Sequence, residues 1–194
     1  MQNNFQFFIT KIVHGVGSSK SVGDIAKKLG AHKALVMHGP NVKAAGIVDP
    51  CVEALKADGI ECVIYDKIEI ESPMHSIEEA AALGRKEGTD ICIAIGGGSS
   101  MDTAKAVGTL LANGGNIRTW ATPAVLEHPI VPLIAVPTTA GTGSEVTFDA
   151  VITDTEAHEK LNILDIKIAP KVALVDPTVL KGLPEKVMAS TGVD

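Results

Sequence analysis

The sequence predicts an α/β fold with a doubly wound, mainly parallel sheet. Short apolar segments rich in β-branched residues alternate with segments of helical periodicity along most of the 194 residues. This alternation is typical of β-α-β units joined by right-handed crossovers. Two of the apolar segments end in small loops rich in glycine and hydroxyl residues. No internal repeat, low-complexity tract or linker interrupts the pattern, so we expect residues 1–194 to form a single domain.

The strands are predicted from short apolar runs that contain β-branched residues. They are expected, in chain order, at residues 5–13, 33–38, 59–65, 90–95 and 130–136, with shorter strands at 147–153, 161–164 and 172–175. The segment at residues 90–95 is almost wholly apolar, as a parallel strand covered on both faces should be.

Helices are predicted in the intervals between the strands. They are expected at residues 18–29, from the turn at residues 39–41 to about residue 57, at 76–87, at 101–112 and from Pro184 onward. Gly30 ends the first of these helices, and proline is tolerated in the first turn of the last. Residues 113–128 form a polar connection.

The most informative segment is IGGGSSMDTAK at residues 95–105, where a strand meets a helix. Its three glycines allow a sharp turn and leave no side chain in the way of a ligand. Ser99 or Ser100 can cap the helix, and Ser99 with Asp102 three residues later resembles a capping box. Free amides at a helix N-terminus behind bare glycines favour an anion site, most often for phosphate. The same segment can also be a tight turn without a ligand.

A second loop of this kind, PTTAGTGSE at residues 137–145, follows the strand at 130–136. Its hydroxyls can bind ribose, phosphate or amide groups, while its glycines keep the space open. The hydroxyls can equally satisfy turn amides and cap a following helix. Two such loops after two strands favour a shared dinucleotide crevice of the Rossmann-like type, although neither loop carries a G-x-G-x-x-G fingerprint.

Together the two loops closely resemble those of the iron-containing (group III) alcohol dehydrogenase family. The resemblance extends to AVITD at residues 150–154, Lys160, ALVDP at 173–177, LP at 183–184 and ASTGVD at 189–194, in the order that the family shows. It covers essentially the whole chain but only the N-terminal part of the family. It therefore implies an NAD(P)-binding domain at residues 1–194, without the family's C-terminal helical metal-binding domain.

The resemblance also makes Asp194 a candidate metal ligand. In the family this aspartate, with histidines further along the chain, holds the catalytic divalent metal, and a carboxylate with imidazoles suits Fe²⁺ or Zn²⁺. Asp194 is the last residue here, and a single carboxylate does not hold such a metal. None of the six histidines has a partner at metal-ligand spacing on one helix. We therefore expect half of an enzyme, with no catalytic residue assigned within it.

By resemblance, the glycine loop would hold the cofactor pyrophosphate and the threonine loop the ribose and nicotinamide portion. Lys160 would reach the cofactor near its ribose, although a lone lysine is ordinarily solvated. Asp149 and Leu180 would lie toward the nicotinamide end. The candidate cofactor-binding residues are Gly39, Gly97, Gly98, Ser99, Asp102, Thr138, Thr139, Thr142, Asp149, Lys160 and Leu180.

Gly39 bears on the choice between NAD and NADP. NAD-preferring members of the family carry an aspartate at this place, and such a carboxylate binds ribose hydroxyls and repels the extra phosphate of NADP. Glycine removes that repulsion and permits NADP. The residues at 39–41 would also make an ordinary turn, so the choice between the two cofactors stays open.

The composition limits the remaining classes of function. A net charge of −6 without clustered lysine or arginine argues against a nucleic-acid partner. Aromatic residues make up only 3%, no apolar run reaches membrane-spanning length, and residues 1–4 do not resemble a signal peptide. Three scattered cysteines, Cys51, Cys62 and Cys92, are expected to be reduced thiols in the core of a cytoplasmic protein.

These observations predict an oxidoreductase that passes hydride between a primary or secondary alcohol and NAD(P), with a divalent metal as Lewis acid. The chain is expected to bind the cofactor without turnover by itself. Residues 5–13 could pair with another subunit in a homodimer or higher homo-oligomer. Two alternatives stay open: an enzyme like glycerol dehydrogenase or dehydroquinate synthase, and a non-catalytic nucleotide-binding module.

Overall fold

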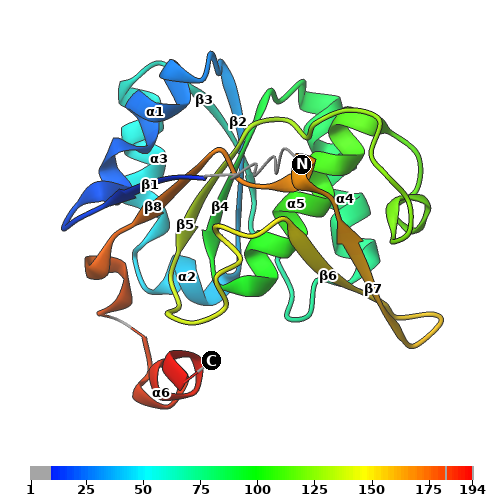
Figure 1. Cartoon of the computed structure of the whole chain (residues 1–194). Coiled ribbons are helices and arrows are strands. Elements are labelled where there is room, and N and C mark those ends of the chain that lie inside the picture. The colour runs from blue at the N-terminus through cyan, green and yellow to red at the C-terminus, as the bar shows by residue number, and fades with distance from the viewer. Residues whose placement is uncertain (1–9, 182, 194) are drawn as a thin grey trace, which may run out of the picture.

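The computed structural model describes residues 10–181 and 183–193. They form a parallel sheet with helices on both faces, and a small hairpin lies to one side (Figure 1). The predicted doubly wound α/β fold is confirmed. Most of the predicted strand at residues 5–13, and with it the proposed subunit contact, lies outside the described residues.

The sheet has six strands, and each neighbouring pair is parallel. Its order is β1-β8-β5-β4-β2-β3. Parallel neighbours need long crossover connections, which the helices supply. The strands are β1 (Lys11–His14), β2 (Lys33–His38), β3 (Glu61–Tyr65), β4 (Ile91–Gly96), β5 (Leu133–Pro137) and β8 (Val172–Val175).

The helices differ from the predicted ones mainly at their ends and in number. The predicted helix at residues 18–29 is a 3₁₀ turn followed by α1, and the one that ends near residue 57 is two helices, with Gly46 in a left-handed conformation between them. The α-helices are α1 (Val22–Lys28), α2 (Pro40–Ala44), α3 (Val48–Ala57), α4 (Met74–Glu87), α5 (Gly98–Asn113) and α6 (Glu185–Val193). The 3₁₀ helices are η1 (Ser18–Ser21), η2 (Ile117–Trp120), η3 (Ile166–Ile168) and η4 (Pro177–Leu180).

The central strands are apolar on both faces because helices cover both. The isoleucines of β4 belong to one buried cluster with side chains of α1 and α3. Cys92 and Ala94 of the same strand belong to a second cluster with side chains of α4 and α5. Since successive side chains of a strand point to opposite faces, this division explains why the segment reads as a continuous apolar run.

The direction of the crossovers reverses between β2 and β4, which lie side by side in the sheet. The connections through α1 and α3 run over one face, whereas those through α4 and α5 run over the other. The helices that follow β2 and β4 therefore diverge, and the carboxyl ends of two such strands are where open α/β sheets bind ligands. Gly39 follows β2 and the glycine loop follows β4, so both lie at this reversal.

The two predicted strands at residues 147–153 and 161–164 do not join the parallel sheet. They form β6 (Asp149–Asp154) and β7 (Glu159–Leu164), an antiparallel hairpin that packs beside α5 (Figure 1). A connection of four residues is too short for a parallel crossover but suits a hairpin. The inward side chains Ala150, Ile152 and Ile163 are buried against α5, which extends the core on that side.

Candidate functional site

The glycine loop turns the chain from β4 into α5. A Cβ atom on Gly96 would lie 2.1 Å from Ser100 Oγ, and the φ of Gly96 is +158°, so no other residue fits there. Gly97 is the N-cap, and Gly98 is the first residue of α5. The free amides of this helix therefore begin directly behind two residues that have no side chain.

The threonine loop lies at the same edge of the sheet as the glycine loop. Gly96 pairs with Pro137 in the register of β4 and β5, and the amide of Thr138 donates to the carbonyl of Gly96 over 2.9 Å. A Cβ atom on Gly97 would lie 3.0 Å from Thr139 Cγ2, and one on Gly98 would lie 3.1 Å from Thr142 Cγ2. The structure thus brings together the glycines and threonines that the sequence singled out. We call Gly97, Gly98, Thr139 and Thr142 the cradle.

The threonines of this loop differ in their surroundings. Thr138 is buried and Thr142 is exposed. Thr139 is half-buried, and its Oγ1 atom, which water does not reach, has no hydrogen-bond partner among the described residues. A buried hydroxyl without a partner is uncommon, and this one lies 3.1 Å from the place that a Cβ of Gly97 would take. The cradle therefore contains a hydroxyl whose hydrogen-bonding capacity is unused among the described residues.

The predicted capping box at the start of α5 is wrong. The helix begins at Gly98, three residues earlier than predicted, and no side chain caps it. Ser99 therefore lies inside the first turn, and its Oγ accepts a hydrogen bond from the amide of Glu71 over 3.1 Å. The amides at the start of the helix remain without a side-chain cap, as an anion site requires.

Asp102 faces the base of the threonine loop. Its carboxylate accepts hydrogen bonds from Ser144 Oγ over 2.6 Å and from the amide of Val151 over 3.2 Å. These bonds join α5 to the loop and to the hairpin. Asp102 was a candidate for cofactor contact, and the described geometry gives it partners within the chain.

Lys105, one turn further along α5, is fully buried, a feature that the sequence analysis missed. Its Nζ donates to Ser144 Oγ over 2.8 Å, to Thr147 Oγ1 over 3.1 Å and to the carbonyl of Asp149 over 2.7 Å. A lysine between Ala104 and Ala106 in an otherwise small and apolar stretch was the available signal. The three acceptors lie 39 to 44 residues away along the chain, so sequence spacing could not reveal them.

Burial shifts both charged groups of this network toward neutrality. Desolvation raises the pKa of Asp102, although the hydrogen bond from Ser144 and the charge of Lys105 oppose the shift. Desolvation also lowers the pKa of Lys105 to about 8, against the attraction of Asp102 and Asp149. The Nζ of Lys105 lies 3.9 Å from Asp102 Oδ1, which is too far for a hydrogen bond. The two groups are instead linked by Ser144 Oγ, which accepts from Lys105 and donates to Asp102.

The other candidates lie on four separate elements. Gly39 is the N-cap of α2, and Leu180 is the last residue of η4. Lys160, on β7, donates from Nζ to Glu71 Oε2 over 2.9 Å and to Thr153 Oγ1 over 2.8 Å. Asp149, the first residue of β6, has a buried Oδ1 atom that no described residue contacts by a hydrogen bond.

The described residues contain no group of three His, Cys, Asp or Glu side chains that could hold a metal ion. Asp194, the candidate metal ligand, lies outside them. The three cysteines are free, and Cys51 and Cys92 are buried as predicted, whereas Cys62 is only half-buried. Among the same residues no helix is long and apolar enough to cross a membrane.

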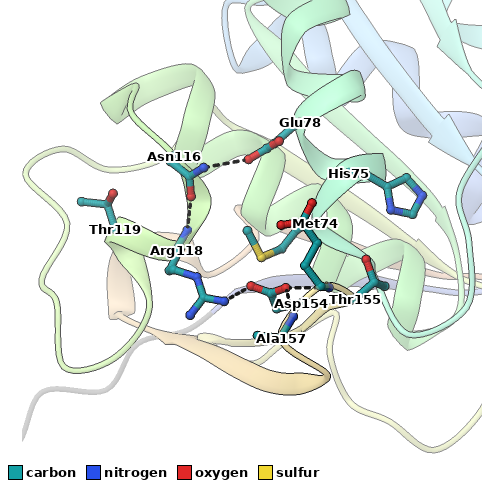
Figure 2. Close-up of a pocket in the computed structure, with 10 residues that line it drawn as sticks. Met74, His75, Glu78, Asn116, Arg118, Thr119, Asp154, Thr155 and Ala157 are labelled. Atoms are coloured by element: carbon teal, nitrogen blue, oxygen red, sulfur yellow. Dashed lines mark hydrogen bonds and ion pairs between the residues drawn. The ribbon is translucent and has the colours of Figure 1, made fainter.

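Among the described residues, one hollow lies away from the candidate residues and a smaller one adjoins the threonine loop. The larger one, about 870 Å³, lies beside the start of α4, and none of the candidate residues lines it. There Arg118 pairs with Asp154, and Asn116 contacts Glu78 (Figure 2). The smaller one, about 90 Å³, lies between α2 and Thr138 and is lined largely by apolar side chains. It adjoins the threonine loop, so it belongs to the candidate site.

The fold and the two loops define a doubly wound α/β domain with an open helix N-terminus at its topological switch. Comparison with known proteins identifies it further. The family model described as iron-containing alcohol dehydrogenase matches residues 10–177. The chain belongs to the iron-containing alcohol dehydrogenase family, as the sequence resemblance predicted.

The chain spans about half the length of the curated relatives it matches. It is 42% identical over 188 residues to a choline dehydrogenase of Bacillus subtilis (strain 168), and the matched region covers 95% of this chain and 47% of the relative. It is 38% identical over 189 residues to an NAD-dependent methanol dehydrogenase of Bacillus methanolicus, with 97% of this chain and 50% of the relative covered. The solved alcohol dehydrogenase from Oenococcus oeni is 36% identical with a TM-score of 0.92, over 98% of this chain and 51% of that one.

Proposed function

We propose that this chain is the NAD(P)-binding half of an alcohol dehydrogenase that passes hydride between a primary or secondary alcohol and the cofactor. The cradle carries this proposal. Two bare glycines, a helix start without a side-chain cap and the unpartnered Thr139 hydroxyl meet at the reversal between β2 and β4. Family membership and the name of the methanol dehydrogenase relative support a nicotinamide cofactor.

The residues present fit a dinucleotide. The amides at Gly98 and Ser99 would donate to the pyrophosphate, whose charge the start of α5 favours. Thr138, Thr139 and Thr142 would bind the ribose and nicotinamide portion, and Lys160 would reach a ribose hydroxyl. The nicotinamide ring supplies the chemistry, because it accepts or gives the hydride. The protein residues hold the ring in place and keep the ligand oriented.

The choice between NAD and NADP is proposed to rest on Gly39. It lies at the end of β2 with an extended backbone, and it carries no carboxylate to repel a 2′-phosphate. We therefore expect this chain to accept NADP as well as NAD. An acidic side chain at this position would restrict binding to NAD.

The proposal is tested by titrating the folded chain with NAD and NADP in a calorimeter and then assaying alcohol-dependent reduction of each. We expect binding of the cofactor but no turnover, with or without added Fe²⁺ or Zn²⁺, because the described residues supply no metal site. Absence of binding by a chain with a native circular dichroism spectrum would contradict the cofactor site. Robust turnover would contradict the view of the chain as half of a catalytic unit, whereas binding of mononucleotides alone would favour a nucleotide-binding module.

A further inference from the structure

The connection between β3 and α4 contains two consecutive residues in a left-handed backbone conformation. Glu71 has a φ of +68° and Ser72 a φ of +51°, and neither is glycine. Such a conformation costs free energy in each residue and persists only where the surroundings hold it. We call this pair the strap, and its hydrogen bonds show what holds it.

One side of the strap is bound to the first turn of α5. The amide of Glu71 donates to Ser99 Oγ over 3.1 Å, and Ser72 Oγ donates to the carbonyl of Ser99 over 3.0 Å. Ser72 is only 1% exposed. Ser99 follows the two cradle glycines directly, so the strap is fixed to the place where the pyrophosphate is proposed to bind.

The other side of the strap is bound to the hairpin. The amide of Thr153 donates to the carbonyl of Ser72 over 3.1 Å, and Thr153 Oγ1 donates to the carbonyl of Glu71 over 2.7 Å. Lys160 Nζ then donates to Glu71 Oε2 and to Thr153 Oγ1. A continuous chain of hydrogen bonds thus runs from Ser99 through the strap to the ammonium group of Lys160.

The pair of Glu71 and Lys160 is exposed, with side-chain accessibilities of 63% and 48%. Exposed ion pairs add little to stability, so the two residues have a weak stabilising role at most. The ammonium group has three N–H donors, of which the described contacts use two. The third remains available to a further acceptor such as a hydroxyl group.

We propose that Glu71 is a positioning residue for cofactor binding, which holds Lys160 so that its remaining N–H meets a ribose hydroxyl of the dinucleotide. This inference rests on the proposed function. Because the strap binds both Ser99 and Lys160, it sets the distance between the two groups that would contact the ligand. Without Glu71 the long lysine side chain must be ordered during binding, which weakens affinity.

The test is a double-mutant cycle on NAD affinity, measured by calorimetry with the whole chain. Glu71→Gln is expected to raise the Kd for NAD about 3- to 10-fold. In a Lys160→Met background the same change is expected to alter the Kd by less than about twofold, because the group that Glu71 positions is gone. Glu69→Gln is the matched control, since Glu69 lies two residues away, carries the same charge and pairs with His75. It should leave the Kd unchanged in both backgrounds.

A second measurement does not depend on ligand binding. Nuclear magnetic resonance of the Lys160 side chain in the free protein should show restricted motion that Glu71→Gln releases and Glu69→Gln does not. Equal effects of Glu71→Gln in both backgrounds, or an unrestricted Lys160 in the unmodified chain, would overturn the inference. Failure of the unmodified chain to bind NAD would instead contradict the proposed function, and the motion of Lys160 would still decide whether Glu71 positions it.

Discussion

At the scale of single residues, the candidate site depends on glycines, which have no side chain. Gly97 has an ordinary backbone conformation, with φ of −89°, so a larger residue there is not excluded by the backbone. The constraint is instead the space toward Thr139, which a Cβ atom would enter. Glycine is therefore required at position 97 by the close approach of Thr139 and not by the backbone conformation.

Gly97→Ala is expected to weaken NAD binding by about tenfold or more while keeping the overall fold, because the added methyl group lies 3.0 Å from Thr139 Cγ2 and displaces this side chain of the cradle. Calorimetric titration gives the affinity, and a thermal melt reports on the fold. Gly192→Ala is the control, because a Cβ at Gly192 meets no atom within 4 Å. An unchanged Kd for Gly97→Ala would show that the ligand does not occupy the cradle.

At the scale of elements, the hairpin of β6 and β7 is tied to α5 by both apolar and polar contacts. Ile163 is fully buried in the cluster that contains α5, while the neighbouring Leu164 is 51% exposed. Asp102 and Lys105 add hydrogen bonds from the helix to the segment at residues 144–151. We therefore expect the hairpin to unfold together with the parallel sheet.

Ile163→Ala is expected to lower the free energy of unfolding by about 2–5 kcal/mol, since it removes buried methyl groups and leaves a cavity. Leu164→Ala, the matched change on the exposed face, should alter it by less than about 0.5 kcal/mol. Urea unfolding of both variants measures the difference. A similar small effect for both would mean that the hairpin unfolds independently of the sheet.

The sequence predicts some elements well and others poorly for identifiable reasons. The strand at β4 is read correctly because its apolar run is buried on both faces and so has no polar interruption. The division between α2 and α3 is missed because the segments on either side of Gly46 have the same periodicity. The predicted capping box fails because the start of α5 is set by the glycine loop, and Ser99 then finds a partner in Glu71.

At the scale of the whole molecule, ionisable groups buried in different elements make stability depend on pH in opposite directions. Lys105 has its pKa lowered to about 8 from an ordinary value of 10.5. Burial raises the pKa of the Cys51 and Cys92 thiols to about 12 from an ordinary value of 9.0. Tyr65 behaves like the thiols, with a pKa raised to about 12 by burial.

Between pH 8 and 10.5 the folded protein releases the proton of Lys105 while the unfolded chain keeps it. The contribution of Lys105 to the free energy of unfolding therefore rises with pH in this window, by at most about 1.4 kcal/mol per pH unit. The buried thiols and Tyr65 oppose this rise, because the unfolded chain loses their protons first. We expect the unfolding free energy of the unmodified chain, minus that of Lys105→Met, to increase with pH over this range.

Methionine has a similar volume to lysine and leaves no large cavity, but it removes the donor to Ser144, Thr147 and the carbonyl of Asp149, so the variant is expected to fold with lower stability at pH 7. Denaturant unfolding at several values of pH between 7 and 10 gives the difference for each. A difference that stays constant over this range would show that the folded-state pKa of Lys105 is not lowered. The outcome depends on no ligand, so it reports on the network between α5 and the hairpin alone.

The site as a whole is predictable only in part. Both loops can be placed at one edge of the sheet from the sequence, because they follow strands that read as parallel neighbours. The partners of Lys105 and the role of Glu71 are not predictable in this way. They arise from contacts between segments that lie far apart in the chain, and no local pattern in the sequence encodes them.

The hydrogen bond from the Thr138 amide to the Gly96 carbonyl has a further consequence. It extends the pairing of β4 and β5 by one residue beyond Pro137, so it forms together with the sheet and without a ligand. The two loops are therefore fixed relative to each other at this point before a dinucleotide binds, and less of the binding energy would be spent on ordering them.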